Sequence, residues 1–226
     1  MLKPRKRLVK AKLKEDKLLV FTAKAQRYIR QNRRSITFAT VGVLVVVCGF
    51  AVYNWSQRAE AAEAALDELL MRDAYARGEL DSVLVRADRI LDDYPRTSSA
   101  AAALMLKGRV HESRGEYEEA IETYERLLRK HSGEKYLAFG ACYALGTIYL
   151  GKDDLEQAAD FYLKAANDYP DHFNAPNALL EAGKCLEKLS RYEQAKRAYH
   201  KIIAEYPKSR TVNRARQRLT GIEFMR

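Results

Sequence analysis

A repeat with a period of 37 or 38 residues constrains the fold more than any other feature of this sequence. Three equivalent glycines, Gly108, Gly146 and Gly183, lie 38 and 37 residues apart. In each unit an alanine follows the glycine by 12 residues and a tyrosine follows that alanine by 4, giving Ala120, Ala158 and Ala195 and then Tyr124, Tyr162 and Tyr199. Self-similarity at such a period indicates a solenoid, in which each unit packs only on its neighbours.

The residue types at these positions predict helical hairpins. Glycine and alanine would lie where two antiparallel helices press together, because a larger side chain would push the helices apart. The tyrosine would fill the space beside that contact, one turn after the alanine. Tight turns inside the pairs are expected at 115–117, 152–154 and 189–191.

The ends of the second helices give the number of units. Proline lacks an amide donor and disfavours helix at the preceding residue, so it ends a helix. Pro95, Ser132, Pro170 and Pro207 are spaced 37, 38 and 37 residues apart, which predicts four units, the first of them degenerate and covering about 60–95. Residues Thr211 to Phe224 are expected to form a closing helix with a polar outer face. The predicted fold class is therefore all-α, with a solenoid over residues 56–226.

This pattern resembles the tetratricopeptide repeat. The middle unit carries its residues at Leu145, Gly146, Tyr149, Ala158, Tyr162, Ala165 and Pro170. The neighbouring units depart from it, with His111 and Leu186 where that repeat has tyrosine and Ser132 where it has proline. The resemblance implies helical hairpins and a protein-binding surface, and it says little about the ligand.

An apolar run before the repeats predicts a membrane anchor. No charged side chain occurs from Ile36 to Tyr53. Eighteen residues at about 1.5 Å each span about 27 Å, and Asn54 and Trp55 extend this to about 30 Å, the thickness of the hydrocarbon core. The sequence thus predicts a transmembrane helix over residues 35–55. A cleaved signal peptide and a buried helix of a soluble protein remain alternatives; the length of the run and of the basic region before it favours an uncleaved anchor.

The charge of the chain is concentrated before this run. Residues 1–35 contain 13 Lys and Arg and 2 acidic residues, a balance of +11, whereas the rest contains 27 basic and 28 acidic residues, a balance of −1. By the positive-inside rule, residues 1–34 form a cytoplasmic arm and residues 56–226 lie on the other side of the membrane. Nucleic-acid binding is not predicted, because no recognition fold accompanies the basic residues.

The basic arm contains a predicted amphipathic helix from Lys12 to Arg34. Leu18, Phe21, Ala25 and Tyr28 recur at helical spacing, and Lys and Arg fill the other face. Such a helix would lie on the anionic membrane surface. The alternative is a disordered arm that only sets the topology.

The layout of the whole chain suggests a class of bacterial envelope protein. The Tyr-Pro links in DDYPRTSS and AEYPKSR, the basic arm and the single span together resemble the single-pass repeat proteins that are ancillary subunits of the Sec translocon. This resemblance implies the bacterial inner membrane, a cytoplasmic N-terminus and a periplasmic solenoid. It also implies a role in protein translocation or envelope protein biogenesis, with translocon subunits, periplasmic chaperones or client polypeptides as partners.

A second hypothesis gives the span itself the main role. Gly42 and Gly49 are seven residues apart, on one face of the predicted helix, and would permit close packing against another helix. The chain would then be a structural accessory subunit or scaffold of a large inner-membrane complex.

No residue pattern points to catalysis, a metal or a cofactor. The four histidines, His111, His131, His172 and His200, are scattered without a paired ligand, and no phosphate-binding glycine loop or nucleophile elbow is present. Cys142 and Cys185 are expected to pack as small apolar residues, although a disulfide would be allowed in an oxidising compartment.

The predicted binding surface is the concave groove that the first helix of each pair lines in repeats of this kind. Its expected positions are Met105, Arg109 and Glu112; Tyr143, Thr147 and Leu150; and Asn177, Leu180 and Lys184. This mixed apolar and polar set would suit an extended or helical peptide. Alternatively, several of these residues are ordinary exposed ones and the working contact lies on the convex face or the span.

Overall fold

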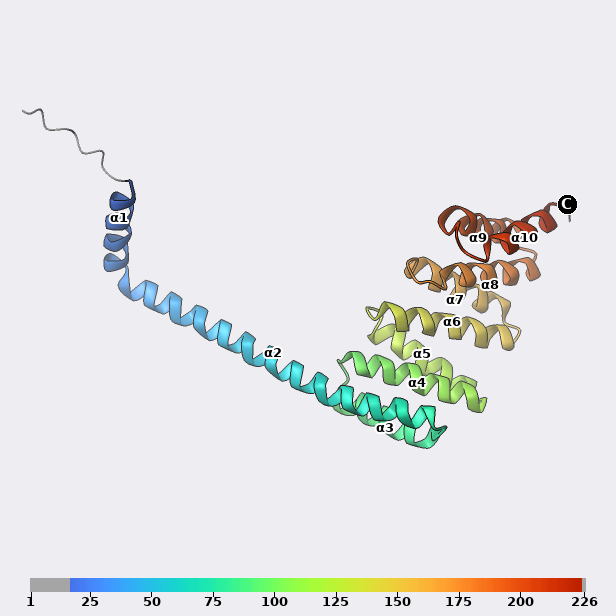
Figure 1. Ribbon diagram of the computed structural model, residues 1–226, viewed down its shortest axis with the longest axis horizontal. Helices are drawn as coiled ribbons and strands as arrows, with labels where there is room; N and C mark the ends of the chain where they lie inside the picture. The colour runs from blue at the N-terminus through green and yellow to red at the C-terminus, as the bar shows by residue number, and fades with distance from the viewer. Residues whose placement is uncertain (1–16, 225–226) are drawn as a thin grey trace, which may run out of the picture. The chain divides into compact units, whose positions relative to one another are not determined.

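The computed structural model describes residues 17–224, and all regular structure in this range is helical (Figure 1). The chain divides into two compact units, residues 1–57 and residues 58–226. The first unit holds α1 (Lys17–Gln31) and the beginning of α2 (Arg33–Ala76). The second unit holds the rest of α2 and all later helices.

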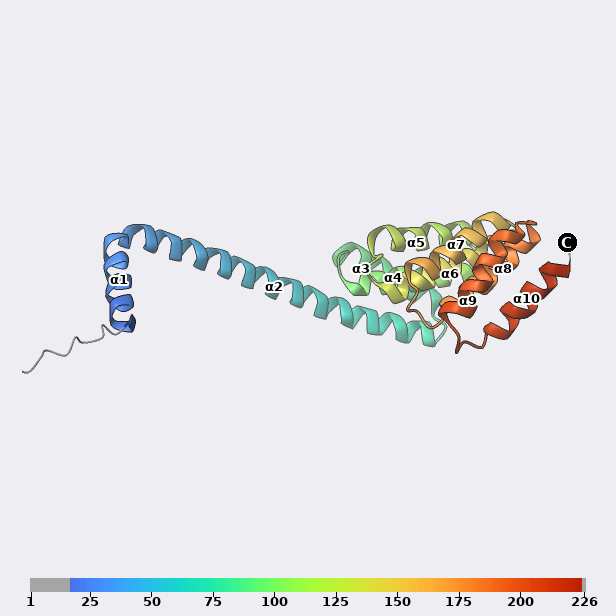
Figure 2. The same ribbon diagram turned by 90° about the horizontal axis from the view of Figure 1, so that it is seen from above.

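The second unit is a stack of four helical hairpins and a closing helix. Its later helices are α3 (Leu80–Asp93), α4 (Ser98–Arg114), α5 (Tyr117–Lys130), α6 (Lys135–Gly151), α7 (Leu155–Asp168), α8 (Ala175–Lys188), α9 (Tyr192–Glu205) and α10 (Val212–Phe224). The end of α2 pairs with α3, and the pairs α4/α5, α6/α7 and α8/α9 follow in chain order (Figures 1 and 2). Helix α10 packs on α9. The all-helical repeat fold, its four units and the closing helix are confirmed.

Each hairpin turns at a residue in the left-handed conformation. These residues are Gly78, Gly115, Asp153 and Ser190, with φ of 76°, 76°, 60° and 58°. Their spacing of 37, 38 and 37 residues repeats that of the whole unit, and the last three lie in the predicted turns. Glycine adopts this conformation freely, whereas Asp153 and Ser190 hold it at a cost of about 1 kcal/mol each.

The recurring spacing of glycine and tyrosine within the repeats reflects a direct contact between them. A Cβ atom on Gly108 would lie 2.5 Å from Cε1 of Tyr124, and one on Gly146 would lie 2.7 Å from Cδ1 of Tyr162. Both distances are far below van der Waals contact. The tyrosine ring of the second helix therefore occupies the space that a side chain on the first helix would need, as the sequence predicted.

Neighbouring hairpins are joined by polar contacts that repeat with the unit. Three ion pairs near the turns link successive units: Arg114 to Asp81 (2.6 Å), Lys152 to Glu118 (2.6 Å) and Arg191 to Glu156 (2.5 Å). The Tyr206 O–H also donates to the carbonyl of Pro170, 2.9 Å away in the preceding unit. These contacts are largely exposed, so each contributes little to the free energy of folding.

Helix α2 joins the apolar run to the solenoid without a break. The sequence predicted an anchor at 35–55 and a separate solenoid at 56–226, whereas one helix runs from Arg33 to Ala76. Residues 56–76 contain seven alanines and neither glycine nor proline, so nothing in the sequence ends a helix there. The first helix of the first repeat is therefore the continuation of the apolar segment.

The first unit contains the predicted amphipathic segment and the apolar run. Helix α1 covers Lys17–Gln31, while the start of the prediction, from Lys12 to Asp16, lies outside the described residues. Helix α2 is long and apolar enough to cross a membrane, and its most apolar stretch is not buried against any other part of residues 17–224. Phe38 and Phe50, for example, are 78 % and 66 % exposed.

Candidate functional site

The first helices of the hairpins line a groove made of two adjoining hollows. One, of about 600 Å³, lies between α4, α6 and the segment before α8. The other, of about 590 Å³, lies between the end of α2, α4 and α6. Arg109, Glu112 and Thr147 line both hollows, so the two form one continuous groove.

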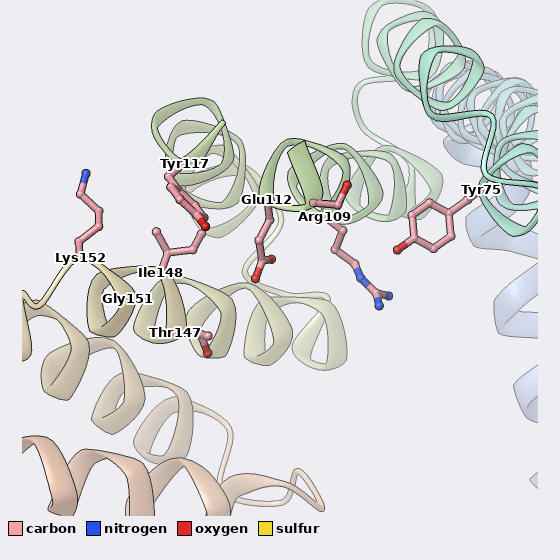
Figure 3. A pocket seen from close by; sticks show the side chains of 9 residues that line it. Tyr75, Arg109, Glu112, Tyr117, Thr147, Ile148, Gly151 and Lys152 are labelled. Carbon is pink, nitrogen blue, oxygen red and sulfur yellow. The ribbon is translucent and has the colours of Figure 1, made fainter. Parts of the chain in front are cut away.

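The part of the groove near α2 is polar and charged. The Arg109 guanidinium lies 5.6 Å from the centroid of the Tyr75 ring, a cation–π contact. Figure 3 shows Arg109 and Glu112 extending from α4, with Tyr75 on the side to which Arg109 points. Lys152 lies at the other end of this hollow. The charged groups of a bound segment would meet a cation and a carboxylate here.

Buried tyrosines hold the polar side chains of the groove in place. The Tyr124 O–H donates to Oε2 of Glu112 at 3.0 Å, and burial, helped by that carboxylate, raises the pKa of Tyr124. The hydroxyl of Thr147 lies 3.1 Å from that of Tyr162, whose pKa burial raises to about 12. Both tyrosines stay protonated at neutral pH, so the repeat core itself orients Glu112 and Thr147.

The other part of the groove is formed by four rings, Tyr136, Phe139, His172 and Phe173, here called the aromatic cluster. The ring centroid of His172 lies 3.7 Å from that of Phe139, in a stacked arrangement, and 4.6 Å from those of Tyr136 and Phe173. Phe139 is buried, whereas Tyr136 and Phe173 are 66 % and 73 % exposed. The cluster thus presents a large aromatic surface to solvent.

His172 makes this cluster apolar at neutral pH. The backbone N–H of Asn174 donates to Nδ1 of His172 at 3.2 Å, which requires that nitrogen to be unprotonated. Burial lowers the pKa of His172. The imidazole is therefore neutral, and it serves as a fourth aromatic ring and not as a cation.

Five of the nine sequence-predicted positions lie together in the groove. Met105, Arg109, Glu112, Tyr143 and Thr147 all line it. They come from α4 and α6, the first helices of the second and third units. Whether they bind a peptide stays a prediction.

The other four positions do not line the groove. Leu150 is half-buried and packs on the core, the Asn177 amide donates to the side chain of Asn174, and Lys184 pairs with Glu181 at 2.8 Å. Leu180 is only 1 % exposed, so its prediction as a groove residue was wrong. Helix α8 buries Ala178 and Leu179 as well, and this wide buried face leaves Leu180 inside the solenoid.

The aromatic cluster was not predicted from the sequence. Tyr136, Phe139 and Tyr143 stand at i, i+3 and i+7 and so share one face of α6, a signal that was available. His172 was read as a scattered histidine. Its place against Phe139 depends on how the link after Pro170 folds back onto α6, which local spacing does not encode.

The titratable groups of the described residues bear on whether the chain has a metal site or a reactive thiol. Within residues 17–224 no group of three or more His, Cys, Asp and Glu is placed to hold a metal ion. Cys142 and Cys185 are free and buried, so they pack as apolar residues, as predicted. Burial raises the pKa of the Cys142 thiol to about 12, which keeps it protonated and unreactive. That the chain is not an enzyme stays a prediction.

Solved structures share this fold. A tetratricopeptide repeat protein from Parabacteroides merdae is 20% identical over 71% of this chain and 60% of its own, with a TM-score of 0.57. PilF of Pseudomonas aeruginosa is 17% identical over 74% of this chain and 70% of its own, with a TM-score of 0.53. A MamA protein is 18% identical over 70% of this chain and 80% of its own, also with a TM-score of 0.53. At such identities the likeness concerns the fold alone.

Sequence comparison gives the family. No curated protein sequence matches the chain significantly. The sequence model of the tetratricopeptide repeat-like domain matches residues 26–223, which include the beginning of α2 as well as all the hairpins. With the hairpin stack and the glycine–tyrosine contacts described above, this match over most of the chain shows that it belongs to the tetratricopeptide repeat-like domain family.

Proposed function

We propose that this chain is a membrane-anchored protein-interaction module of the bacterial inner membrane. The apolar part of α2 is its anchor, the solenoid lies on the periplasmic side, and the groove binds a segment of another protein. The observation that carries the binding proposal is the exposed aromatic cluster at one end of a groove whose other end is charged.

The chemistry of the groove favours a polypeptide as its ligand. A bound apolar side chain would cover Tyr136 and Phe173, and burial of apolar surface contributes about 25 cal/mol per Å². Arg109 and Glu112 would pair with polar groups of the same segment, farther along the groove. An aromatic anchor site beside charged positions is typical of surfaces that bind peptides.

The anchoring proposal rests on the apolar segment. Residues 36–53 carry no charge and belong to an exposed helix. Tyr53 and Trp55, 58 % and 75 % exposed, stand at its end, where aromatic rings favour the membrane interface. The family match begins at residue 26. It therefore includes the apolar segment, which supports the view that this segment belongs to the same domain model as the repeats.

The proposed side of the membrane is supported by the charge distribution, and the proposed partners by the resemblance to ancillary translocon subunits. A balance of +11 in residues 1–35 favours a cytoplasmic N-terminus and a periplasmic solenoid. The proposed partners are translocon subunits, periplasmic chaperones or client polypeptides during translocation or envelope biogenesis. The mechanism is tethering, because confinement to the membrane raises the local concentration of weakly binding partners.

Cysteine labelling tests the topology. In a Cys48→Ser chain, Val85→Cys on α3 and Lys24→Cys on α1 place exposed thiols on the two sides of the apolar segment. After permeabilisation of the outer membrane, an impermeant maleimide should label Val85→Cys alone. Labelling of Lys24→Cys alone would overturn the orientation, and a soluble, shortened Val85→Cys product would show a cleaved signal.

Groove variants test the binding proposal. The combination of Tyr136→Ser and Phe173→Ser removes the exposed rings of the aromatic cluster, and Val85→Ser removes an equally exposed apolar side chain elsewhere. We expect the first variant to recover the protein partners of the wild type about tenfold less well, equivalent to about 1.4 kcal/mol. Val85→Ser should match the wild type. Equal recovery in both variants would exclude the aromatic cluster as the binding site.

The scaffold hypothesis also has a structural observation in its favour. A Cβ atom on Gly42 or Gly49 would meet no atom within 4 Å among the described residues. The side of the span that carries these glycines is therefore open to another transmembrane helix. In that case the span and not the groove would provide the principal contact with the partner.

A further inference from the structure

The part of α2 that belongs to the solenoid unit has two distinct faces. One is used by the fold, and its buried residues are Ala64, Asp67, Met71 and Ala74. Asp67 on this face lies 3.5 Å from Arg89 of α3. The other face points away from the hairpins and is exposed.

The exposed face carries a regular stripe of apolar residues, here called the outer stripe. It consists of Ala59, Ala62, Leu66 and Leu69, at successive spacings of 3, 4 and 3 residues. Leu66 and Leu69 are 61 % and 63 % exposed, and the adjoining Leu70 is 38 % exposed. Two leucines with most of their surface in water, one turn apart, form an apolar patch that another helix could cover.

The spacing of the outer stripe is that of a coiled coil. If Ala59 is position a of a heptad, Ala62 is d, Leu66 is a and Leu69 is d. The buried residues of α2 then occupy positions b and f, which face away from a coiled-coil partner. The helix can therefore pack on the solenoid with one face and on a second helix with the other.

We infer that the outer stripe joins two copies of this chain in a parallel, two-stranded coiled coil. A stripe at positions a and d is self-complementary, because each residue meets its own equivalent across a twofold axis. The interface is short, from Ala59 to Leu70. Asp73, at the next position a, ends it one turn before the end of α2.

Charges beside the outer stripe favour this occupant and this orientation. In a parallel pair, position g of one helix lies near position e of the other, five residues later. Arg58 at g would therefore lie near Glu63 of the second copy, an attractive pair formed twice. An antiparallel pair would instead place Arg58 near Arg72, which are both cations. Glu63 is already held in place, since its Oε2 accepts a hydrogen bond from Tyr94 at 2.9 Å.

Such a dimer would leave the groove open in both copies. The residue of α2 that lines the groove is Tyr75, at position c, away from the stripe. Each assembly would thus present two grooves, and a partner with two binding segments would be held by both.

Cysteine crosslinking of the full chain in cells tests the inference with a matched pair of positions. Ala62 lies in the outer stripe, whereas Ala61 is the adjacent residue at position c; both are exposed alanines. Each is replaced by cysteine in a Cys48→Ser chain and oxidised in place. Ala62→Cys should give a reducible product of twice the monomer mass, in at least fivefold higher yield than Ala61→Cys.

Mass spectrometry of the product decides between occupants. A disulfide between two peptides that both contain position 62 supports the dimer. A product with a different protein, equal yields at the two positions, or no product from a thiol that still reacts with a maleimide would overturn it.

The charge pair provides an independent test of orientation. Arg58→Glu in the Ala62→Cys chain places two carboxylates near each other and should lower the yield of crosslinked dimer severalfold. Adding Glu63→Arg restores opposite charges and should restore the yield. Yields that respond to neither substitution would contradict the parallel register.

Discussion

At the scale of single residues, each hairpin depends on the contact between a glycine and a tyrosine ring. We predict that Gly146→Ala lowers the free energy of unfolding by about 1–3 kcal/mol, because its Cβ atom would lie 2.7 Å from the Tyr162 ring. Gly151→Ala is the control, since a Cβ atom there meets nothing within 4 Å and should stabilise α6 slightly. Thermal unfolding of the detergent-solubilised chain measures both variants. If Gly146→Ala were as stable as the wild type, the Tyr162 ring would have to move aside at no cost in free energy.

The buried tyrosines give the solenoid a specific response to high pH. Burial raises the pKa of Tyr162 from 10 to about 12, so the phenol stays neutral in the folded state while it ionises in the unfolded state. Its contribution is complete below pH 10 and is lost as the pH rises from 10 to 12, at up to about 1.4 kcal/mol per pH unit. In Tyr162→Phe the loss of stability between pH 9 and pH 11 should be smaller than in the wild type. An identical loss would exclude this tyrosine as a cause.

Substitution of Leu180 tests whether its side chain belongs to the core or to the groove. Its side chain is 1 % exposed, so Leu180→Ala should lower the free energy of unfolding by about 2–4 kcal/mol through lost burial and a cavity. Thr147→Ala, in the groove, should cost about 1 kcal/mol for its hydrogen bond to Tyr162. If Leu180→Ala kept full stability and lost only partner binding, the assignment to the core would be wrong.

The sequence could predict the contacts of residues that recur at equivalent positions of the repeats. The recurring glycine, alanine and tyrosine imply one packing solution, and the structure has it at Gly108 and Gly146. His172 and Phe173 lie in a link outside the repeat pattern. Their stacking on Phe139 is a tertiary contact, so helical spacing could not reveal it.

At the scale of helices, the residues that form turns and end helices made the hairpins predictable. Turns were expected around Gly115, Asp153 and Ser190, and these three residues have positive φ. The continuity of α2 was not predicted, because the boundary at residue 56 was placed where the polarity changes, and no residue that ends a helix lies there. A change from apolar to charged residues changes the solvent that a helix favours, lipid or water, but it does not end the helix.

The span offers a test between the two hypotheses on function. Gly42→Leu combined with Gly49→Leu fills the open side of α2 within the apolar segment. If the groove is the working surface, this variant should insert into the membrane and recover its partners as the wild type does. Loss of a stoichiometric membrane partner from a purified complex, with the groove unchanged, would favour the scaffold hypothesis instead.

At the scale of the whole molecule, charge, apolar segment and groove belong to one proposed arrangement. The balance of +11 in residues 1–35 would hold the N-terminus in the cytoplasm, and α2 leads directly from the apolar segment into the first repeat. Of this arrangement the sequence predicted the helical repeat fold, which the structure confirms, and five of the residues that line the groove; the topology stays a prediction. The repeat pattern does not identify the partner, because it specifies the residues that pack between helices and not those at the exposed positions.

Site-specific photo-crosslinking in intact cells tests the central claim most directly. A benzophenone amino acid replaces Tyr136, in the aromatic cluster, or His200, which is exposed on the second helix of the last hairpin. Our account predicts that Tyr136 forms adducts with periplasmic or membrane proteins and that His200 does not. The same adducts from both positions would contradict a binding role for the groove, and adducts only with cytoplasmic proteins would contradict the proposed topology.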